Sequence, residues 1–295
     1  MKGSEVIQHA EAKLTEVLGK STHVDSTALI SGGCINHSMK LETNVGSFFL
    51  KQNQAGPSDL FLREAESLTT LRKAAIRLKI PEVYVATTID TDQSGILILE
   101  FLTIESSNPS FEEQLGQGLA ELHRVTKNDY GFYHDNYCGA TLQKNQWSND
   151  WAYFFGQQRI WHLINLIENR RGISSHDKSI YEQLLIRLPT LIGHNPAPSL
   201  NHGDLWSGNC LFTTNGPALI DPASYFADRE FDLALMAMFG GFSRRVWDAY
   251  QETYPLANDW RERVSLYQLY HYLNHYYLFG GSYGATAISI AKSYL

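Results

Sequence analysis

The stretch His202-Gly203-Asp204-Leu205-Trp206-Ser207-Gly208-Asn209 carries the strongest signal in this chain. Asp221-Pro222-Ala223 follows it, so that a second acid stands 17 residues after Asp204. Enzymes that transfer a phosphoryl group to a hydroxyl use one carboxylate to orient that hydroxyl, and neighbouring oxygen ligands to hold magnesium. The spacing therefore predicts a phosphoryl-transfer site, with Asp204 as the base and with Asn209 and Asp221 as Mg²⁺ ligands.

A β-hairpin is predicted between the two halves of this site. Residues 210–212 and 218–220 are short apolar runs, and Asn215-Gly216 between them is a strong turn signal. Such a hairpin folds the chain back and places Asn209 beside Asp221. Either residue alone is more often a turn or capping residue, but the two with a hairpin between them favour a metal site.

The N-terminal third of the chain has the pattern of a small lobe built on an antiparallel sheet. Apolar runs predict its strands over residues 26–41 (with a turn at 31–34), 47–52, 83–89 and 95–102. Apolar residues at helical spacing predict one helix over residues 60–71, between the third strand and the fourth. Residues 1–20 add an amphipathic helix ahead of the sheet, without the continuous apolar stretch of a signal peptide.

Lys51 lies within an apolar strand of this lobe. A lysine on a largely buried strand is costly unless it is paired, and Glu64 on the following helix is the natural partner. Glu66 lies on the same helix but should face another way. Such a pair could hold the α- and β-phosphates of ATP. The alternative is an edge-strand lysine that faces water.

Two further segments could contact the nucleotide. The glycine-containing turn could cover the phosphates with backbone N–H groups, and its residues are Gly32, Gly33, Cys34, Ile35 and Asn36. The end of the last strand could offer backbone donors and acceptors to an adenine, through Glu100, Phe101 and Leu102. For Cys34, a reactive thiol and an inert one are both open.

The character of the chain changes to helical after Thr103. Apolar residues at helical spacing predict helices over residues 111–125, 151–169, 179–191 and from about 231 onward. Residues 100–105 are then the natural junction between two lobes. We expect an α+β chain with an N-terminal ATP-binding lobe over residues 1–102 and a larger, mainly helical catalytic and substrate lobe over residues 103–295.

Composition excludes several classes of function. The formal net charge is −7 and there is no long Lys/Arg run, so a nucleic-acid partner is not expected. The three cysteines are widely spaced and form neither a disulfide framework nor a zinc pattern, which favours a reducing cytoplasm. No apolar run reaches the length of a membrane span, so no membrane association is expected.

Substrate contacts are the least defined part of the site. Four side chains near the motif are candidates, namely His202, Trp206, Arg229 and Glu230. We expect His202 to orient the loop by hydrogen bonding and not to act as the base. For Arg229 and Glu230, a role at the start of a helix, where acids interact with the helix dipole, is equally open.

The motif and its surroundings resemble the fructosamine kinases, also called ketosamine-3-kinases. These belong with the aminoglycoside phosphotransferases and choline kinases, which have a protein-kinase-like fold. The Trp-Ser-Gly-Asn part of the motif is typical of the fructosamine branch, and residues 32–36, 49–51, 119–124 and 221–232 also match its pattern. The resemblance implies that Asp204 is the base, that Asn209 and Asp221 bind Mg²⁺, and that Lys51 with Glu64 holds ATP.

The resemblance also implies a reaction. The family transfers a phosphoryl group from ATP to the 3-hydroxyl of a ketosamine, which is the rearranged sugar adduct of a free amine or a protein lysine. The product is unstable and releases the amine, which amounts to deglycation. The substrate is then a small ketosamine or a glycated protein. The sugar, the state of the amine and the choice between monomer and homodimer, including a dimer linked through Cys34, stay open.

Two other functions are consistent with the same residues. One is a kinase for another small hydroxyl compound, such as an aminoglycoside or a choline-like amino alcohol. The other is a nucleotide-binding module without catalysis, although a complete set of catalytic residues argues against it. Asp-Pro-Ala replaces the Asp-Phe-Gly of protein kinases, and no activation segment is evident, so protein hydroxyls are not expected as acceptors.

Overall fold

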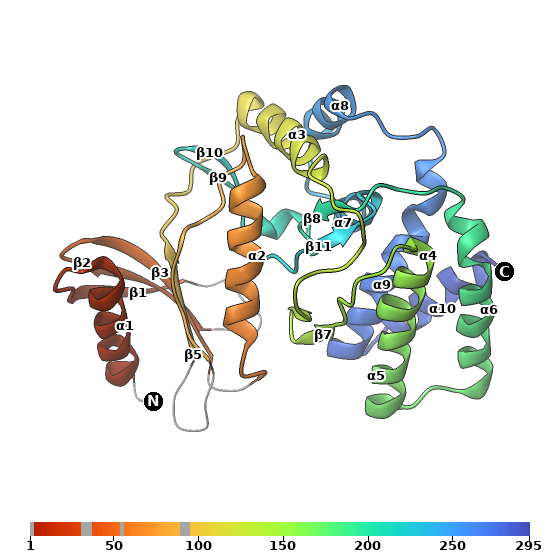
Figure 1. Ribbon diagram of the computed structural model, residues 1–295, viewed down its shortest axis with the longest axis horizontal. Helices are drawn as coiled ribbons and strands as arrows, with labels where there is room; N and C mark the ends of the chain where they lie inside the picture. The colour runs from red at the N-terminus through yellow and green to blue at the C-terminus, as the bar shows by residue number, and fades with distance from the viewer. Residues whose placement is uncertain (1–2, 31–36, 54–55, 89–94) are drawn as a thin grey trace.

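The computed structural model describes residues 3–30, 37–53, 56–88 and 95–295 (Figure 1). The described chain is α+β, with a five-stranded sheet in its N-terminal part and helices through most of the remainder. Figure 1 shows the sheet at one end of the molecule and the helical part at the other. The expected phosphate cover, Gly32 to Asn36, lies outside the described residues and stays a prediction.

The sheet is antiparallel throughout, in the order β1-β2-β3-β5-β4. Its strands are β1 (Val24–Ile30), β2 (His37–Thr43), β3 (Gly46–Asn53), β4 (Val83–Ala86) and β5 (Gly95–Glu100). β3 is a central strand, and on it Lys51 stands between Ser38 of β2 and Leu97 of β5. The alternative, a lysine on an edge strand that faces water, is therefore excluded.

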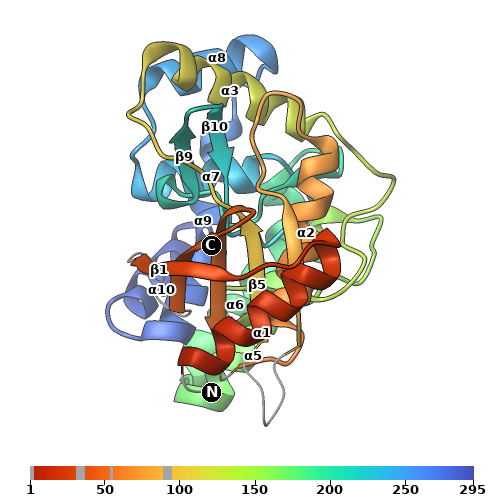
Figure 2. The same cartoon turned by 90° about the vertical axis from the view of Figure 1, so that its left-hand side faces the viewer.

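A helix covers each face of the sheet, because side chains alternate between the faces along a strand. Leu50, Ile96 and Ile98 pack with Val6, Ala10 and Leu14 of α1 (Gly3–Leu18). Leu97 and Leu99 instead join the larger core with Phe61, Leu68 and Leu71 of α2 (Leu60–Ala74). Figure 2 shows α1 lying across the outer face of the sheet, and α1 is the amphipathic helix predicted over residues 1–20.

The hairpin predicted within the motif exists and is joined to the N-terminal part. It consists of β9 (Cys210–Thr213) and β10 (Gly216–Leu219). The Lys79 N–H donates to the Pro217 carbonyl at 2.8 Å, and the Leu219 N–H donates to the Lys79 carbonyl at 3.0 Å. The Glu105 N–H donates to Phe212 at 2.8 Å. The hairpin is therefore held by the backbones of two segments, one between α2 and β4 within the N-terminal part and one that leads from the sheet to the helical part.

The helical part surrounds the motif. Its helices are α3 (Pro109–His123), α4 (Trp151–Tyr153), a π-helix (Phe154–Trp161), α5 (His162–Arg171), α6 (Ser175–Ile192), α7 (Glu230–Phe239), α8 (Arg244–Thr253), α9 (Trp260–Phe279) and α10 (Tyr283–Ser293). Two further antiparallel strand pairs are β6 (Asn136–Cys138) with β7 (Thr141–Gln143), and β8 (Ser199–Asn201) with β11 (Tyr225–Ala227). None of the described helices is both long and apolar enough to cross a bilayer.

The helices expected from periodicity are present, with one local difference. The segment predicted as one helix over residues 151–169 is helical throughout, but its middle is the π-helix. The fully buried Arg159 lies there and donates to the Asn145 side chain at 2.7 Å, and its guanidinium stands 3.9 Å from the centre of the Tyr225 ring. The buried apolar side chains step by five residues within this π-helix, from Phe155 to Ile160, where a regular α-helix would step by three or four.

Gly116 sets the approach of α3 to α8. A Cβ at this position would stand 2.2 Å from the Val246 carbonyl oxygen and 2.9 Å from the Tyr250 nitrogen, so both contacts are to backbone. We expect Gly116→Ala to lower the unfolding free energy by about 1–3 kcal/mol, because the helices must separate. Urea denaturation measures this, with the exposed Glu113→Ala on the same helix as the control. Equal stability of the two variants would contradict the packing described.

Candidate active site

The site is centred on three charged side chains from distant parts of the chain. The Lys51 ammonium donates to Glu64 Oε1 at 2.7 Å and to Asp221 Oδ1 at 2.6 Å. Lys51 comes from β3, Glu64 from α2 and Asp221 from the end of the hairpin. The Lys51 side chain is only 5% exposed, whereas that of Asp221 is 42% exposed. The predicted Lys51–Glu64 pair is present, and Asp221 is a further partner of the lysine.

This arrangement keeps Lys51 cationic. Burial alone would lower the pKa of Lys51, but the carboxylates of Asp221 and Glu64 outweigh burial and raise it above its usual value. A buried ammonium held between two carboxylates is a fixed positive charge, oriented toward the exposed carboxylate of Asp221. The N-terminal sheet and the helical part are thereby joined by an ion pair at the site itself.

Asp221 occupies a strained backbone position. Its φ is 55°, the single positive φ of a non-glycine residue in the described part of the chain. Residues held in this region cost about 1–3 kcal/mol and cluster at functional sites. The Ile220 N–H donates to the Asn209 carbonyl at 3.0 Å, which sets Asn209 next to the start of the Asp221 segment. The hairpin therefore brings these two residues together, as the sequence predicted.

Asp204 lies on the loop that precedes the hairpin. The Asn209 side-chain amide donates to the Asp204 carbonyl at 2.9 Å and to its carboxylate at 3.2 Å. Burial raises the pKa of Asp204 to about 7, the nearby Asp221 carboxylate adds to the rise, and the Asn209 hydrogen bond opposes it. A carboxyl with a pKa near neutrality is suited to accept a proton and give it up again.

Asp232, on α7, accepts backbone hydrogen bonds from the loop that carries Asp204. Its carboxylate accepts the His202 N–H at 2.6 Å and the Gly203 N–H at 2.8 Å, and it faces His123 Nε2 at 3.3 Å. Burial acts to raise the pKa of Asp232, but the His123 hydrogen bond and the other partners outweigh it and lower the pKa. Asp232 and His123 thus form one buried network with the backbone of this loop.

His202 is fully buried, and both its ring nitrogens are engaged. Nδ1 accepts the Asp204 N–H at 3.3 Å, and Nε2 faces the Ile220 carbonyl at 3.0 Å, so the ring is neutral and donates from Nε2. Burial lowers the pKa of His202, which agrees with this tautomer. Gly203 has a φ of 86°, and a Cβ there would stand 2.0 Å from the Ala223 carbonyl oxygen. The His-Gly pair therefore shapes the loop.

Both the sequence and the structure of this chain are similar to those of known proteins. The family model of the fructosamine kinases matches residues 6–295 of the chain. The chain belongs to the fructosamine kinase family. It is 37% identical to a probable ketoamine kinase of Vibrio cholerae over 92% of the chain and 93% of that protein. It is 40% identical to a chloroplastic protein-ribulosamine 3-kinase of Oryza sativa over 96% of the chain and 82% of that protein.

Solved structures agree on the fold. A candidate fructosamine-3-kinase from Thermobifida fusca superposes with a TM-score of 0.85 and 31% identity, over 96% of this chain and 97% of that one. The aminoglycoside phosphotransferase APH(4)-Ia superposes with a TM-score of 0.64 over 97% of each chain, at 14% identity, and so shows the fold alone. The expected protein-kinase-like fold and the family resemblance are confirmed.

Trp206 lies in the part of the motif that is typical of this family, and it is the exposed one among the four candidate substrate residues, at 40%. Its ring lies against Gly208, where a Cβ would stand 2.1 Å from the ring. Glycine at this position is therefore required by the tryptophan. Trp206 stays a predicted substrate contact, because its exposed ring offers an apolar face beside the Asp204 loop.

Arg229 and Glu230 have partners within the protein. The Arg229 guanidinium donates to the Tyr254 carbonyl at 2.8 Å and stacks on the Tyr254 ring at 3.5 Å. The buried Glu230 carboxylate receives two hydrogen bonds from Arg263, at 2.7 and 2.9 Å. The structure does not bring these two side chains to Asp204, and it favours the alternative that they serve the start of α7 and its packing.

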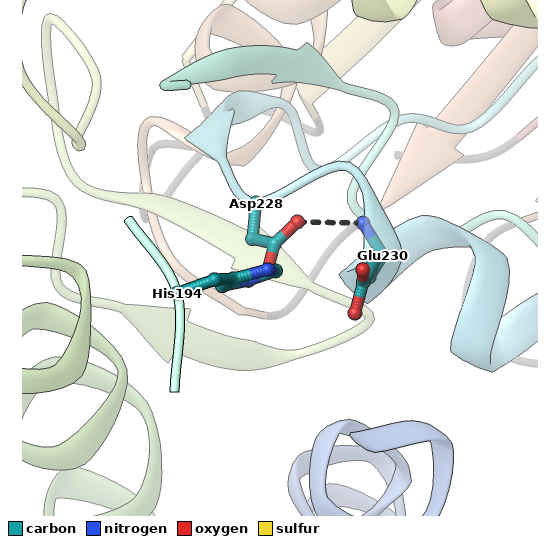
Figure 3. Close-up of side chains that lie close together, drawn as sticks. All are labelled: His194, Asp228 and Glu230. Carbon is teal, nitrogen blue, oxygen red and sulfur yellow. Dashed lines mark hydrogen bonds and ion pairs between the residues drawn. The ribbon is translucent and has the colours of Figure 1, made fainter. Parts of the chain in front are cut away.

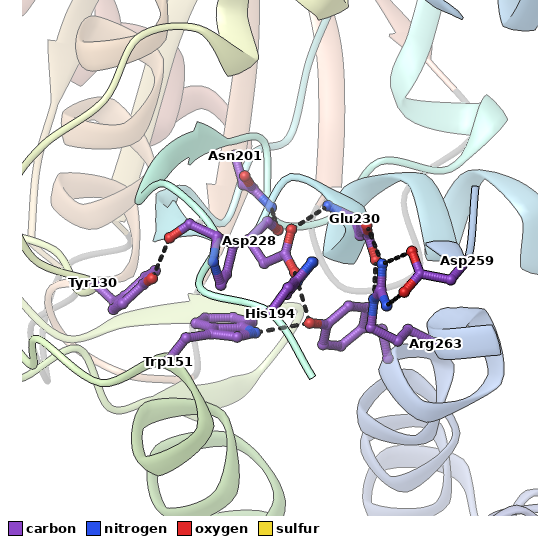
Figure 4. A network of polar contacts seen from close by, with 10 residues as sticks. Tyr130, Trp151, His194, Asn201, Asp228, Glu230, Asp259 and Arg263 are labelled. Atoms are coloured by element: carbon purple, nitrogen blue, oxygen red, sulfur yellow. Dashed lines mark hydrogen bonds and ion pairs between the residues drawn. The ribbon is translucent and has the colours of Figure 1, made fainter. Parts of the chain in front are cut away.

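His194, Asp228 and Glu230 form a second charged group, with ligand atoms within 4.8 Å of one another (Figure 3). Figure 4 shows that their oxygens already have partners in a wider network. Asp228 accepts from Tyr267 at 2.7 Å and from the Glu230 N–H at 3.0 Å, and it faces His194 at 2.8 Å. Arg263 donates to both oxygens of Glu230, so the carboxylates of this group already have hydrogen-bond donors and the group does not fit a metal ion.

The segment expected to meet an adenine lies beside the hairpin. The Glu100 side chain pairs with Lys79 at 2.6 Å, and its N–H donates to the Glu82 carbonyl at 2.8 Å. The neighbouring Thr103 and Glu105 bond to the hairpin through their backbones, but Phe101 and Leu102 do not. The Lys40 ammonium stands 4.3 Å from the centre of the Phe101 ring. The adenine contact itself stays a prediction.

The pKa of Asp204 leads to a test on metal-free protein. Between the unfolded value of 3.8 and the folded value of about 7, the folded state binds a proton that the unfolded state has lost, so stability falls as pH rises. In EDTA, we expect the unfolding free energy of wild type to fall by on the order of 2 kcal/mol between pH 5 and pH 8, relative to that of Asp204→Asn over the same range. Urea denaturation at both pH values measures the difference. Parallel pH profiles would show that Asp204 is ionised throughout.

Proposed function

We propose that this fructosamine kinase family member transfers a phosphoryl group from ATP to the 3-hydroxyl of a ketosamine. The observation that carries the proposal is the Lys51–Asp221 ion pair beside the Asp204–Asn209 contact. Together these place a fixed cation, an exposed carboxylate and a carboxyl with a raised pKa around one volume. Phosphoryl transfer needs this combination, because catalysis rests on positioning and on charge.

Each residue has a defined part in the proposed reaction. Asp204 accepts a hydrogen bond from the substrate hydroxyl and takes its proton as the oxygen attacks the γ-phosphorus, while the bond from that phosphorus to the β-phosphate oxygen breaks and ADP leaves. Asn209 holds the Asp204 carboxylate in place through the 3.2 Å hydrogen bond. Lys51, oriented by Glu64, interacts with phosphate oxygens of ATP. His202 and Asp232 keep the loop in position and do not touch the substrate.

The oxygen atoms at the site fit a magnesium ion. Asn209 uses its side-chain nitrogen toward Asp204, which leaves its amide oxygen for a ligand. Asp221 uses one carboxylate oxygen toward Lys51 and remains 42% exposed. Hard cations prefer such carboxylate and amide oxygens. Bound there, magnesium would neutralise phosphate charge, and Asn209 and Asp221 are the residues that would hold it.

The acceptor is proposed to be a ketosamine, because relatives of similar length are named as ketoamine and ribulosamine kinases. We propose that it is a small ketosamine or a glycated protein, and that the enzyme works in the cytoplasm with its lobes divided near residue 102. A monomer and a homodimer are both compatible with the site. An aminoglycoside or amino alcohol is the alternative acceptor; the similarity to APH(4)-Ia concerns the fold alone.

A substrate panel tests the proposed function. Purified protein with ATP and magnesium is offered fructosyl-lysine, ribulosyl-lysine, a glycated protein, an aminoglycoside and choline. We expect phosphate transfer to at least one ketosamine and to neither of the last two compounds. Transfer to an aminoglycoside or choline alone would establish the alternative. ATP binding without transfer to any compound would support a non-catalytic module.

Replacement of Asp204 should affect chemistry and leave nucleotide binding intact. We expect Asp204→Asn to lower kcat on the ketosamine by roughly 10²–10⁴-fold, because the general base is lost. KM for ATP should stay close to that of wild type, since the nucleotide contacts come from other residues. Steady-state kinetics with both substrates measures this. Turnover at the wild-type rate would rule out Asp204 as the base.

Replacement of Lys51 should instead weaken nucleotide binding. Loss of a charged hydrogen bond to phosphate corresponds to a rise in KM for ATP of roughly 10–100-fold in Lys51→Met. Lys13→Met, at an exposed surface ion pair, is the control and should behave as wild type. An unchanged KM for ATP in Lys51→Met would show that this lysine does not contact the nucleotide.

A further inference from the structure

Helix α2 packs against the sheet with one face and lines a groove with the other. Residues Phe61, Leu68 and Leu71 pack toward the sheet, and Glu64 at the same spacing reaches Lys51. The other face lines a groove of about 670 Å³. The residues of α2 in this groove are Leu62, Ala65, Glu66, Thr69, Thr70, Lys73 and Ala74, which form one helical stripe. Figure 1 shows α2 standing between the sheet and the segment that follows α3.

The groove has an apolar floor and a rigid far wall. Leu200, Phe226 and Val125 from the helical part provide apolar surface. The Lys127 N–H donates to the Pro198 carbonyl at 3.0 Å, which fixes the backbone of the wall. Its ammonium lies 5.4 Å from the centre of the Tyr133 ring and 5.6 Å from that of Phe226. A volume of this size accommodates a small organic molecule.

The charge of the groove differs from that of the whole protein. Two lysines line it, Lys73 and Lys127, and no carboxylate of the described residues pairs with either. The one acid in the groove, Glu66, is already held by His134 at 2.8 Å and by Arg63 at 3.5 Å. Two lysines without a carboxylate partner thus line this groove, in a chain whose net charge is −7.

We propose that this groove binds a small organic anion with an apolar body, and that its occupancy is transmitted through α2 to the nucleotide side. The anionic group lies between Lys73 and Lys127, and the apolar body lies on Leu200 and Phe226. The ligand then contacts the face of α2 opposite Glu64. Any shift of the helix acts on the Lys51–Glu64 pair, so occupancy alters the KM for ATP; this second part rests on the proposed function.

The probe is 1-anilinonaphthalene-8-sulfonate, which joins an aromatic body to a sulfonate and fluoresces when shielded from water. We expect saturable binding to wild type that ATP does not displace. Lys73→Ala/Lys127→Ala should bind about tenfold more weakly, since two exposed charge contacts are lost. Thr69→Glu, an exposed position that puts a negative charge in the groove, should also weaken binding.

The control variant is Lys20→Ala/Lys292→Ala, which removes the same net charge from exposed positions outside the groove. It should bind the probe as wild type does. Displacement by ATP, equal binding by the Lys73/Lys127 double variant, or equal weakening in the control would overturn the site. In turnover assays, the probe should change the KM for ATP of wild type and not that of the double variant. Binding without such a change would overturn the transmission through α2.

Discussion

The ion pair between Lys51 and Asp221 is the constraint on which the rest of the structure depends. It joins a central strand of the sheet to the end of a hairpin 170 residues later, at 2.6 Å. A buried ammonium is stable only with such partners, and loss of one partner from a buried pair is strongly destabilising. The sheet, α2 and the hairpin are therefore held in one relative position.

The loop of Asp204 is rigid for a related reason. Its backbone N–H groups end on the buried Asp232, and its histidine is locked between the Asp204 N–H and the Ile220 carbonyl. The strained Asp221 follows the hairpin, which is itself bonded to Lys79, between α2 and β4, and to Glu105, after the sheet. The proposed role of Asp204 as the base benefits from this rigidity, because its supporting groups need no rearrangement during a reaction.

Local patterns in the sequence predicted the parts of this site that are local. The motif with its hairpin, and the need of a lysine on a buried strand for a partner, led to Asp204, Asn209, Asp221 and the Lys51–Glu64 pair. The roles of Asp232 and Arg263 were missed, because their partners are brought together by packing across many residues. Arg229 and Glu230 were candidates for substrate contacts and for packing at the start of a helix. The sequence pattern at a helix start is the same in both cases, so it could not distinguish them.

We propose that this site phosphorylates the 3-hydroxyl of a ketosamine. The most direct measurement is phosphorus and proton NMR of the product formed from ATP and fructosyl-lysine. We expect a new phosphorus signal that is coupled to the proton on carbon 3 of the sugar, followed by the appearance of free lysine. A phosphorus signal coupled to another carbon's proton, or inorganic phosphate with the ketosamine intact, would contradict it.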